Sequence, residues 1–462
     1  MLFSSLTFLY YFLPVVLALY FLTPQRGKNL VLLLASLIFY WWGEPRYVVL
    51  MLGVIAFAYV SGLLIDRFRR TRAAKGLLAL AVCGELAVLG YFKYADFFLN
   101  SINAVLKTQF PALSVALPIG ISFYIFQTLS YLIDLYRGDV AVQRSPLKLA
   151  TYIALFPQLI AGPIVRYSTV ERELTARRTG VEDLSAGLGR FVLGLSKKVL
   201  IANQMGALVS ALRGSGEETL LTFWLMALAF LFQIYFDFSG YSDMAIGLGR
   251  VFGFHFPENF NYPLTARSAT EFWRRWHISL GTWFRDYVYI PLGGSRRGKL
   301  RQLCNILIVW SLTGLWHGAA WNFVLWGLLF AAALSLEKLG LLTLLERAPA
   351  VLRHGYLLLL VLISFVIFNA DGLSGVAQDL SGLLGLRGGW IAEQTQYYAV
   401  SYAALLGIAA VGATPLPKKA AQCLAGTAIG AVLRPLMLLG LLLVCTAYLV
   451  DGSFNPFLYF RF

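Results

Sequence analysis

Charged residues are scarce in this sequence. Of its 462 residues, 13% are Asp, Glu, Lys or Arg, and 59% are hydrophobic. A soluble domain carries about 25% charged residues, so this chain has too few to cover a water-exposed surface of its size. That shortage excludes a secreted soluble enzyme and a disordered scaffold. It indicates a protein that crosses a lipid bilayer several times.

Cysteine and histidine are also scarce, with four of each. The cysteines form no Cys-x-x-Cys pair, which argues against a disulfide framework and against a zinc site. We expect them to pack as small core residues. Two histidines, His277 and His317, have no evident third ligand, so we expect no metal.

Several catalytic signatures are missing. The nearest approach to a Gly-x-Ser-x-Gly turn begins at Gly240 and lacks the last glycine, which argues against a serine hydrolase. The glycines that begin at Gly247 miss the dinucleotide-binding spacing by one residue and follow no predicted strand. There is no Walker loop and no haem-attachment motif. We therefore expect no bound cofactor.

Long apolar stretches are abundant. A helix needs about 20 mainly apolar residues to cross a bilayer. The candidates are roughly residues 4–22, 29–42, 47–65, 77–92, 117–135, 220–238, 303–316, 319–336, 355–369, 396–413 and 434–450. We predict an all-α polytopic membrane protein with about eleven transmembrane helices. No repeat or long linker interrupts the sequence, so we expect one domain over residues 1–462.

Basic residues exceed acidic ones, 38 to 23, for a net charge of +15. In a soluble protein this excess would suggest nucleic acid. Here the basic residues gather in short loops such as 66–75, as cytoplasmic loops do, so we expect no nucleic-acid partner. This bias places the N-terminus outside and the C-terminus in the cytoplasm, with a first span that is retained. Attraction of an anionic cytosolic substrate is a second explanation.

Residues 147–165 are apolar but are interrupted by Pro157, Gly162 and Pro163. Proline inside a helix removes a hydrogen bond and kinks the chain. Basic residues flank this segment on both sides, which favours a re-entrant or interfacial hairpin over a clean span. Irregular backbone at membrane depth is tolerated inside protein or along a wet cavity. We therefore expect the chain to enclose a cavity.

Residues 271–287 have helical periodicity. An aromatic stripe comprises Trp273, Trp276, Leu280, Trp283 and Tyr287, and a polar stripe beside it comprises Arg274, His277, Gly281 and Arg285. An interfacial anchor helix would explain the aromatic stripe. It would not explain a histidine between two arginines, whose charges should lower the imidazole pKa and favour the neutral base.

His317 lies inside an apolar stretch and is surrounded by small residues such as Gly314 and Gly318. An ionisable residue within a span is by default a functional candidate. The alternative is a hydrogen-bonded core histidine between closely packed helices. A neutral imidazole can take the proton of a hydroxyl that attacks a thioester, which is acyl transfer to an alcohol.

Asp237 and Asp243 lie at the predicted end of the 220–238 span, and Arg250 follows them. An ion pair that fixes the helix end is one interpretation. Substrate binding by Asp237 is the other.

Motifs along nearly the whole chain resemble the membrane-bound O-acyltransferase family. They begin at Leu117 (Leu-Pro-Ile-Gly-Ile-Ser-Phe-Tyr), Phe156 (Phe-Pro-Gln-Leu-Ile-Ala-Gly-Pro), Tyr235 (Tyr-Phe-Asp-Phe-Ser-Gly-Tyr-Ser-Asp-Met), Glu258 (Glu-Asn-Phe-Asn), Glu271 (Glu-Phe-Trp-Arg-Arg-Trp-His-Ile-Ser-Leu), Gly314 (Gly-Leu-Trp-His-Gly) and Asn455 (Asn-Pro-Phe-Leu-Tyr-Phe-Arg-Phe). The stretches around His277 and His317 are highly specific. Within the family, the motifs are most similar to members that acetylate exported bacterial polysaccharides.

The resemblance implies a helical bundle around a central tunnel in the bacterial inner membrane. His317 matches the family's catalytic histidine and His277 its second polar position. Acetyl would pass from cytosolic acetyl-coenzyme A to an exported polysaccharide, with alginate as the first candidate, through a periplasmic acetyltransferase partner. We assign donor or substrate binding to Arg274, Arg275, Arg285, Trp273, Trp276, Trp316, Asn261 and Asp237. Here His277 would orient donor or acceptor, or stabilise the thioester carbonyl.

Three points stay open. Many polysaccharide-type relatives have Phe-Arg where this chain has Phe368-Asn369, so a charge near the late spans is missing. Cellulose or peptidoglycan could be the acceptor, or D-alanine could be loaded onto teichoic acids. A glycan or acyl transporter without chemistry would also contain broken helices and intramembrane polar residues, although no half-to-half repeat supports it.

Overall fold

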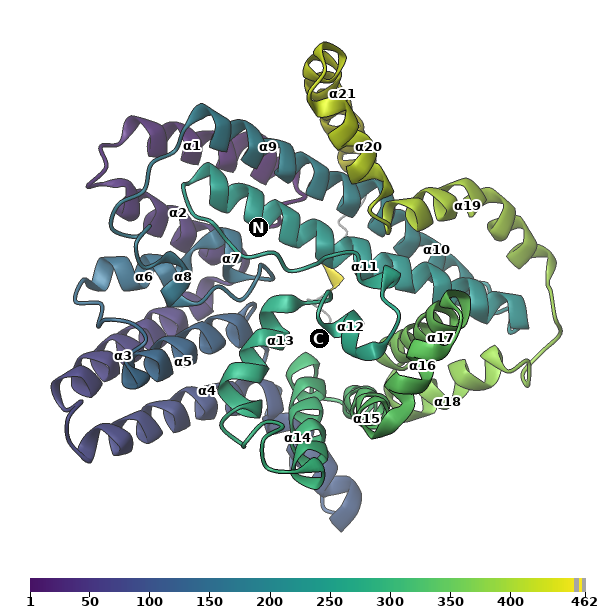
Figure 1. Ribbon diagram of the computed structural model, residues 1–462, viewed down its shortest axis with the longest axis horizontal. Helices are drawn as coiled ribbons and strands as arrows, with labels where there is room; N and C mark the ends of the chain where they lie inside the picture. Colours follow the sequence, from purple (N-terminus) through teal and green to yellow (C-terminus); the bar gives the residue numbers. More distant parts are fainter. Residues whose placement is uncertain (453–456, 459–462) are drawn as a thin grey trace. The chain divides into compact units, whose positions relative to one another are not determined.

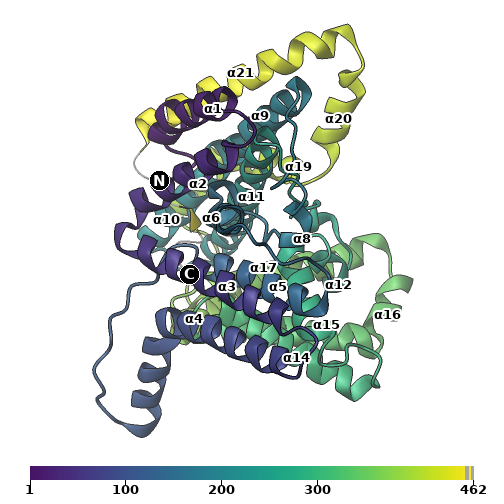
Figure 2. The ribbon, with the colours of Figure 1, turned by 90° about the vertical axis from the view of Figure 1, so that its left-hand side faces the viewer.

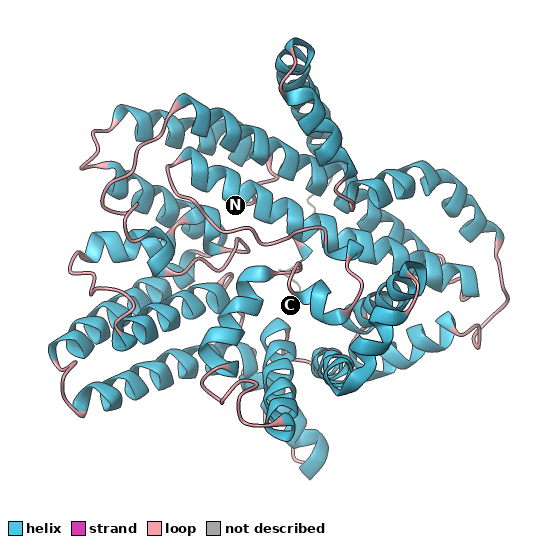
Figure 3. Cartoon of the chain, in the orientation of Figure 1, coloured by secondary structure: helices cyan, strands magenta, loops and turns pink. Residues whose placement is uncertain are grey.

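The computed structural model describes residues 1–452, 457 and 458. Within these residues, Figure 3 shows helices and loops and no strand, which confirms the predicted all-α class. The motif that begins at Asn455 lies mostly outside the described residues.

The chain divides into two compact units. The first comprises Met1–Phe191 and Tyr241–Pro257, and the second comprises Val192–Gly240 and Glu258–Phe462. The single domain expected from the sequence stays a prediction, and each unit is described by itself.

The first unit begins with a π-helical turn and five main helices. These are α1 (Leu13–Leu22), α2 (Lys28–Gly43), α3 (Val48–Arg67), α4 (Ala73–Leu106) and α5 (Ile121–Arg137). Helices α3, α4 and α5 pack side by side (Figure 1). The short helices α6 (Pro146–Ala154), α7 (Phe156–Leu159) and α8 (Tyr167–Val170) follow them.

The proline-containing segment is broken, as predicted. Helix α6 ends at Ala154, and Leu155 has a non-helical ψ of 110° before the four-residue α7. Residues 151–165 are all buried in protein. Several of their polar groups have partners inside the protein: the amide of Phe156 donates to Ser36 Oγ at 3.0 Å, and Nε2 of Gln158 donates to the Tyr152 carbonyl at 2.6 Å. Burial of this kind is what irregular backbone at membrane depth requires.

The second unit holds the remaining helices. Helix α9 (Val181–Ser196) belongs to the first unit as far as Phe191, and its last turn continues in the second unit through a π-helical segment, Lys197–Ala202. The rest are α10 (Asn203–Gly214), α11 (Leu220–Val251, whose last turns belong to the first unit), α12 (Ala269–Trp273), α13 (Ile278–Phe284), α14 (Lys299–His317), α15 (Trp321–Leu336), α16 (Leu342–Arg347), α17 (Ala350–Asn369), α18 (Gly372–Leu383), α19 (Glu393–Gly412), α20 (Leu416–Ala425) and α21 (Ala428–Asp451). Figure 2 shows α20 and the long α21 meeting at a sharp bend.

Glycines bring α14 and α15 into close contact. A Cβ atom on Gly314 would collide with the backbone oxygen of Phe323, and one on Gly327 would collide with that of Trp310. Small residues allow such backbone approach between membrane helices. The packing fixes the end of α14, where His317 lies.

Six helices in the described residues are long and apolar enough to cross a membrane, or seven if the bent pair α19 and α20 is one span. They are Pro45–Arg67, Ala73–Leu106, Leu220–Val251, Trp321–Arg347, Ala350–Asn369 and Ala428–Asp451. Two shorter apolar helices, Phe8–Leu22 and Lys28–Gly43, add to them. A multi-pass architecture is confirmed, and the count of eleven is not.

The cysteines were expected in the core. Cys445 is buried, but Cys83, Cys304 and Cys423 are exposed on their helices. In a membrane protein, apolar residues also cover the outer face of the bundle, so apolar surroundings in the sequence do not indicate the core.

Candidate active site

His317 is the last residue of α14. The helix stops there because the backbone of Gly318 is extended, at φ −167° and ψ 151°. The ring of Phe323 packs against Gly318 so closely that a Cβ atom there would collide with it. The imidazole is 4% exposed. Aromatic rings surround it, with centroids at 5.0 Å for Trp316, 4.9 Å for Trp326 and 5.4 Å for Phe368.

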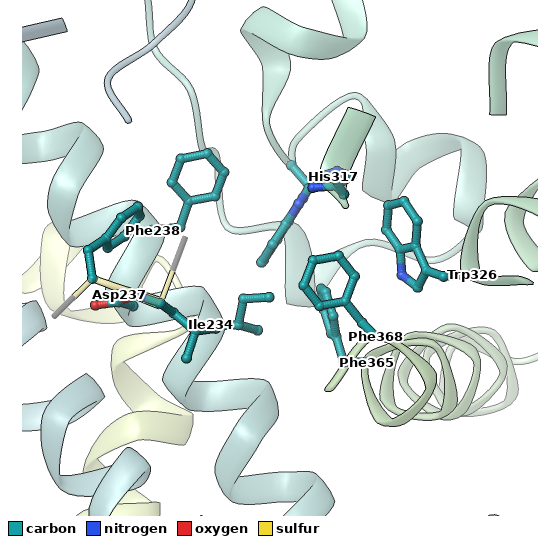
Figure 4. A pocket seen from close by; sticks show the side chains of 10 residues that line it. Ile234, Asp237, Phe238, His317, Trp326, Phe365 and Phe368 are labelled. Atoms are coloured by element: carbon teal, nitrogen blue, oxygen red, sulfur yellow. The ribbon is translucent and has the colours of Figure 1, made fainter. Parts of the chain in front are cut away.

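His317 lines a small cavity of about 20 Å³. The other lining residues are Ile234, Asp237, Phe238, Trp276, Trp326, Phe365, Phe368, Phe457 and Leu458. Figure 4 shows Ile234, Asp237 and Phe238 on one side and His317 with three rings on the other. The space is mostly aromatic and has room for one water-sized group. It suits a short, uncharged acyl group better than a long chain.

The sequence around His277 does not form the predicted continuous helix. Helix α12 ends at Trp273, and His277 adopts a left-handed φ of 43° before α13 begins. Residues 275–278 instead pair with the backbone of residues 259–261. The amide of Asn261 donates to the Arg275 carbonyl at 2.9 Å, and the amide of Ile278 donates to the Asn259 carbonyl at 3.0 Å. The predicted aromatic and arginine stripes therefore do not exist as helical faces.

His277 is 1% exposed, and its Nδ1 lies 3.3 Å from the side-chain oxygen of Asn259. Burial lowers the pKa of His277 to about 3, so the ring is neutral. The direction of this shift was predicted correctly, but its cause was not, because burial and not arginine repulsion produces it. Arg274 is in fact exposed.

Both histidines contact the same residue, Trp316. The ring of Trp316 lies 5.9 Å from that of His277 and 5.0 Å from that of His317. Trp276 lines the His317 cavity, whereas Trp273 packs on Trp310 with centroids 4.5 Å apart. The structure thus gathers the predicted histidines and tryptophans, which lie far apart in the sequence, in one region.

Asn261 was assigned to the site, but it is exposed. Its neighbour Asn259 is fully buried and contacts His277 and Ser279. Both asparagines lie in one short motif. The sequence therefore identified the motif but did not indicate which of its two asparagine side chains is buried beside His277.

Asp237 does not fix a helix end, because α11 continues to Val251. Its carboxylate instead pairs with Lys198 at 2.5 Å, with both side chains at most 5% exposed, and accepts from the amide of Leu458 at 2.8 Å. Lys198 was not recognised from the sequence. Asp243 pairs with Arg190 at 2.8 Å.

The three predicted donor-binding arginines have different surroundings. Arg274 is exposed, and Arg285 pairs with Asp286 at 2.6 Å. Arg275 pairs with Glu271 at 2.5 Å and faces an open pocket of about 820 Å³. The sequence analysis missed three other basic residues that line this pocket: Arg267, Arg353 and His354.

A second open pocket, of about 750 Å³, is polar. Its lining includes Ser210, Arg213, Asn322, Asn369 and Asp371, together with Phe323 and Phe368. Asp379 holds Arg213 through two hydrogen bonds, at 2.7 and 2.9 Å. Phe368 also contacts His317, so one aromatic layer separates this pocket from the histidine.

The two open pockets lie at opposite ends of α17. Arg353 and His354 are in its first turns, whereas residues 368–372 are at and just after its last turn. Twenty residues of helix span about 30 Å, which matches the hydrocarbon thickness of a bilayer. Phe365 and Phe368 of the same helix line the His317 cavity.

Comparison of the sequence with known proteins identifies the family of this chain. Residues 140–349 match the model of the membrane-bound O-acyltransferase family. A probable alginate O-acetylase of Pseudomonas putida is 41% identical and aligns over 100% of both chains. The chain belongs to the membrane-bound O-acyltransferase family. The predicted resemblance is thereby confirmed.

Other members act on other polymers. A peptidoglycan O-acetyltransferase of Helicobacter pylori is 35% identical over 84% of this chain and 80% of its own. A teichoic acid D-alanyltransferase of Bacillus subtilis is 28% identical over 47% of this chain and 58% of its own. This family member is thus a multi-pass membrane acyltransferase, and a transporter without chemistry is not supported.

Proposed function

We propose that this protein passes an acetyl group from cytosolic acetyl-coenzyme A across the bacterial inner membrane for O-acetylation of an exported polysaccharide, with alginate as the first candidate. A periplasmic acetyltransferase partner would complete the transfer. The observation that carries the proposal is the position of His317 in a small cavity that α17 also lines. The two ends of α17 border the two open polar pockets.

The donor would enter at the pocket lined by Arg267, Arg275 and Arg353. Guanidinium groups bind phosphate through paired hydrogen bonds, and coenzyme A carries several phosphates. Nε of Arg353 is buried and has no hydrogen-bond partner among the described residues, which supports a role for this side chain in holding a ligand. Lys338 and Arg347 lie in the neighbouring segment, and cytoplasmic loops collect basic residues, which supports a cytosolic position for this end. In this orientation the C-terminus would also be cytoplasmic and the N-terminus would lie outside.

His317 would act as the general base. It takes the proton of the acceptor hydroxyl while the hydroxyl oxygen attacks the thioester carbonyl. The new C–O bond forms, the C–S bond breaks, and the proton passes to the leaving thiolate of coenzyme A. The small aromatic cavity favours acetyl over longer acyl groups.

The acceptor would approach through the pocket near Asn369 and Asp371, at the other end of α17. Alginate is favoured as the final polymer because the Pseudomonas putida relative covers the whole chain. The peptidoglycan O-acetyltransferase relative favours peptidoglycan as the second candidate.

The test is the acetyl-ester content of the cell's exported polysaccharides at matched membrane abundance. We expect His317→Ala to abolish the esters and His255→Ala to leave them unchanged, because His255 is exposed and pairs with Glu173. The polymer that loses its esters identifies the acceptor. Normal esters in His317→Ala would overturn the proposal.

A further inference from the structure

Three polar groups converge on the side-chain oxygen of Asn259. The backbone amide of Ser279 lies at 3.2 Å, the Ser279 hydroxyl at 2.9 Å and Nδ1 of His277 at 3.3 Å. A backbone amide can only donate, so the Asn259 atom that faces it is the carbonyl oxygen. The same oxygen faces His277, and therefore Nδ1 of His277 carries the hydrogen.

This arrangement determines what the other ring nitrogen can do. A neutral imidazole has one N–H, so Nε2 of His277 carries a lone pair. Nε2 is buried and has no hydrogen-bond partner among the described residues. A buried polar atom of this kind costs free energy unless a ligand satisfies it. A neutral ring with Nδ1–H cannot donate from Nε2, so it cannot stabilise the thioester carbonyl.

Three consecutive residues connect the basic pocket to this nitrogen. Arg275 lines the pocket, Trp276 lines the His317 cavity, and His277 follows. Since this segment borders both the pocket and the cavity, we infer that the pantetheine arm of a donor whose phosphates bind at the pocket runs along it toward His317. That arm contains two amide groups, each with an N–H donor.

We propose that Asn259 is a positioning residue that holds His277 as the Nδ1–H tautomer, so that Nε2 accepts a hydrogen bond from an amide N–H of the donor's pantetheine arm. This inference rests on the proposed function, because it assumes a coenzyme A thioester as donor. It assigns His277 to donor binding and leaves the proton transfer to His317.

The groups around His277 are uncharged. Phe238 of α11 lies edge-on at 4.6 Å, Trp316 of α14 lies at 5.9 Å, and Ser279 of α13 and Asn259 complete the shell. The titratable groups of these elements that line the neighbouring cavity are His317 of α14 and Asp237 of α11, and the Asp237 carboxylate pairs with Lys198. Because burial keeps the pKa of His277 near 3, donor affinity in the unaltered protein should not change through this ring between about pH 5 and pH 8.

The test measures KM for acetyl-coenzyme A and kcat with the full-length protein in lipid vesicles. Asn259→Leu should raise KM about 3- to 10-fold, the equivalent of one lost hydrogen bond, with kcat nearly unchanged. Asn259→Asp keeps the acceptor oxygen but adds a negative charge, which raises the imidazole pKa. Its KM should be normal at alkaline pH and rise as the pH falls, because the protonated ring no longer accepts at Nε2.

Thr282→Ala on α13 is the matched control, since the Thr282 hydroxyl donates to the backbone carbonyl of Ser279 at 2.9 Å, and its loss should leave KM within about twofold. A pH-independent KM in Asn259→Asp, or a fall in kcat at constant KM in Asn259→Leu, would overturn the inference. Thermal unfolding of each variant verifies that it is folded. Absence of acetyl transfer by the unaltered protein would refute the proposed function, whereas normal transfer with unaffected Asn259 variants would refute this inference alone.

Discussion

Removing one partner of the buried Lys198–Asp237 pair should destabilise the protein far more than removing both. The two charged groups lie 2.5 Å apart, and their side chains are 5% and 2% exposed. A buried charge left without its partner costs about 3–5 kcal/mol, whereas replacing both charges by apolar residues of similar volume is often neutral or stabilising. Lys198→Met and Asp237→Leu should therefore each lose about 3–5 kcal/mol, and the double variant should lose little.

The assay is denaturant unfolding of the full-length protein in mixed micelles, with the four proteins arranged as a double-mutant cycle. Asp243→Asn is the control on the same helix. Its ion pair with Arg190 is more exposed, at 18% and 30%, so its loss should cost at most about 1 kcal/mol. If either single variant is as stable as the unaltered protein, or the double variant loses the sum of both single effects, the reasoning is refuted.

Two further substitutions test the packing and the donor pocket. Gly314→Ala should push α14 away from α15, because the new Cβ atom would collide with the carbonyl oxygen of Phe323. We expect a lower unfolding temperature and reduced acetyl transfer for this variant. Gly407→Ala is the control: Gly407 has open space around it, so this variant should change neither quantity. Arg353→Ala should raise KM for acetyl-coenzyme A about tenfold or more, as expected for a lost charge-assisted hydrogen bond, and Arg274→Ala should raise it less because Arg274 lies outside the pocket. Equal unfolding temperatures for the two glycine variants, or equal KM values for the two arginine variants, would contradict these assignments.

The sequence predicted features that depend on composition and on local breakers. Scarce charge and long apolar runs indicated the membrane and the all-α class, and Pro157 located the broken segment. A histidine within an apolar stretch pointed to His317. The first signal is a property of the whole composition and the others are local, so none of them needed tertiary information.

Features that depend on distant partners were missed. Helical periodicity in residues 271–287 did not reveal that the backbone of residues 259–261 takes the hydrogen bonds of residues 275–278 and breaks the helix at His277. The pairing of Lys198 with Asp237 joins two helices, so neither local sequence indicates it. The basic pocket combines residues from α12, α16 and α17, and local spacing could not group them.

The most direct test of the central claim is acetyl transfer across a sealed bilayer. The full-length protein is reconstituted in vesicles, with radiolabelled acetyl-coenzyme A on the side of the Arg353 pocket and an acceptor polysaccharide with its periplasmic partner on the other side. We predict labelled ester on the acceptor with the unaltered protein and with His255→Ala, and none with His317→Ala. Equal labelling by His317→Ala, or labelling only when donor and acceptor share one side, would contradict the account.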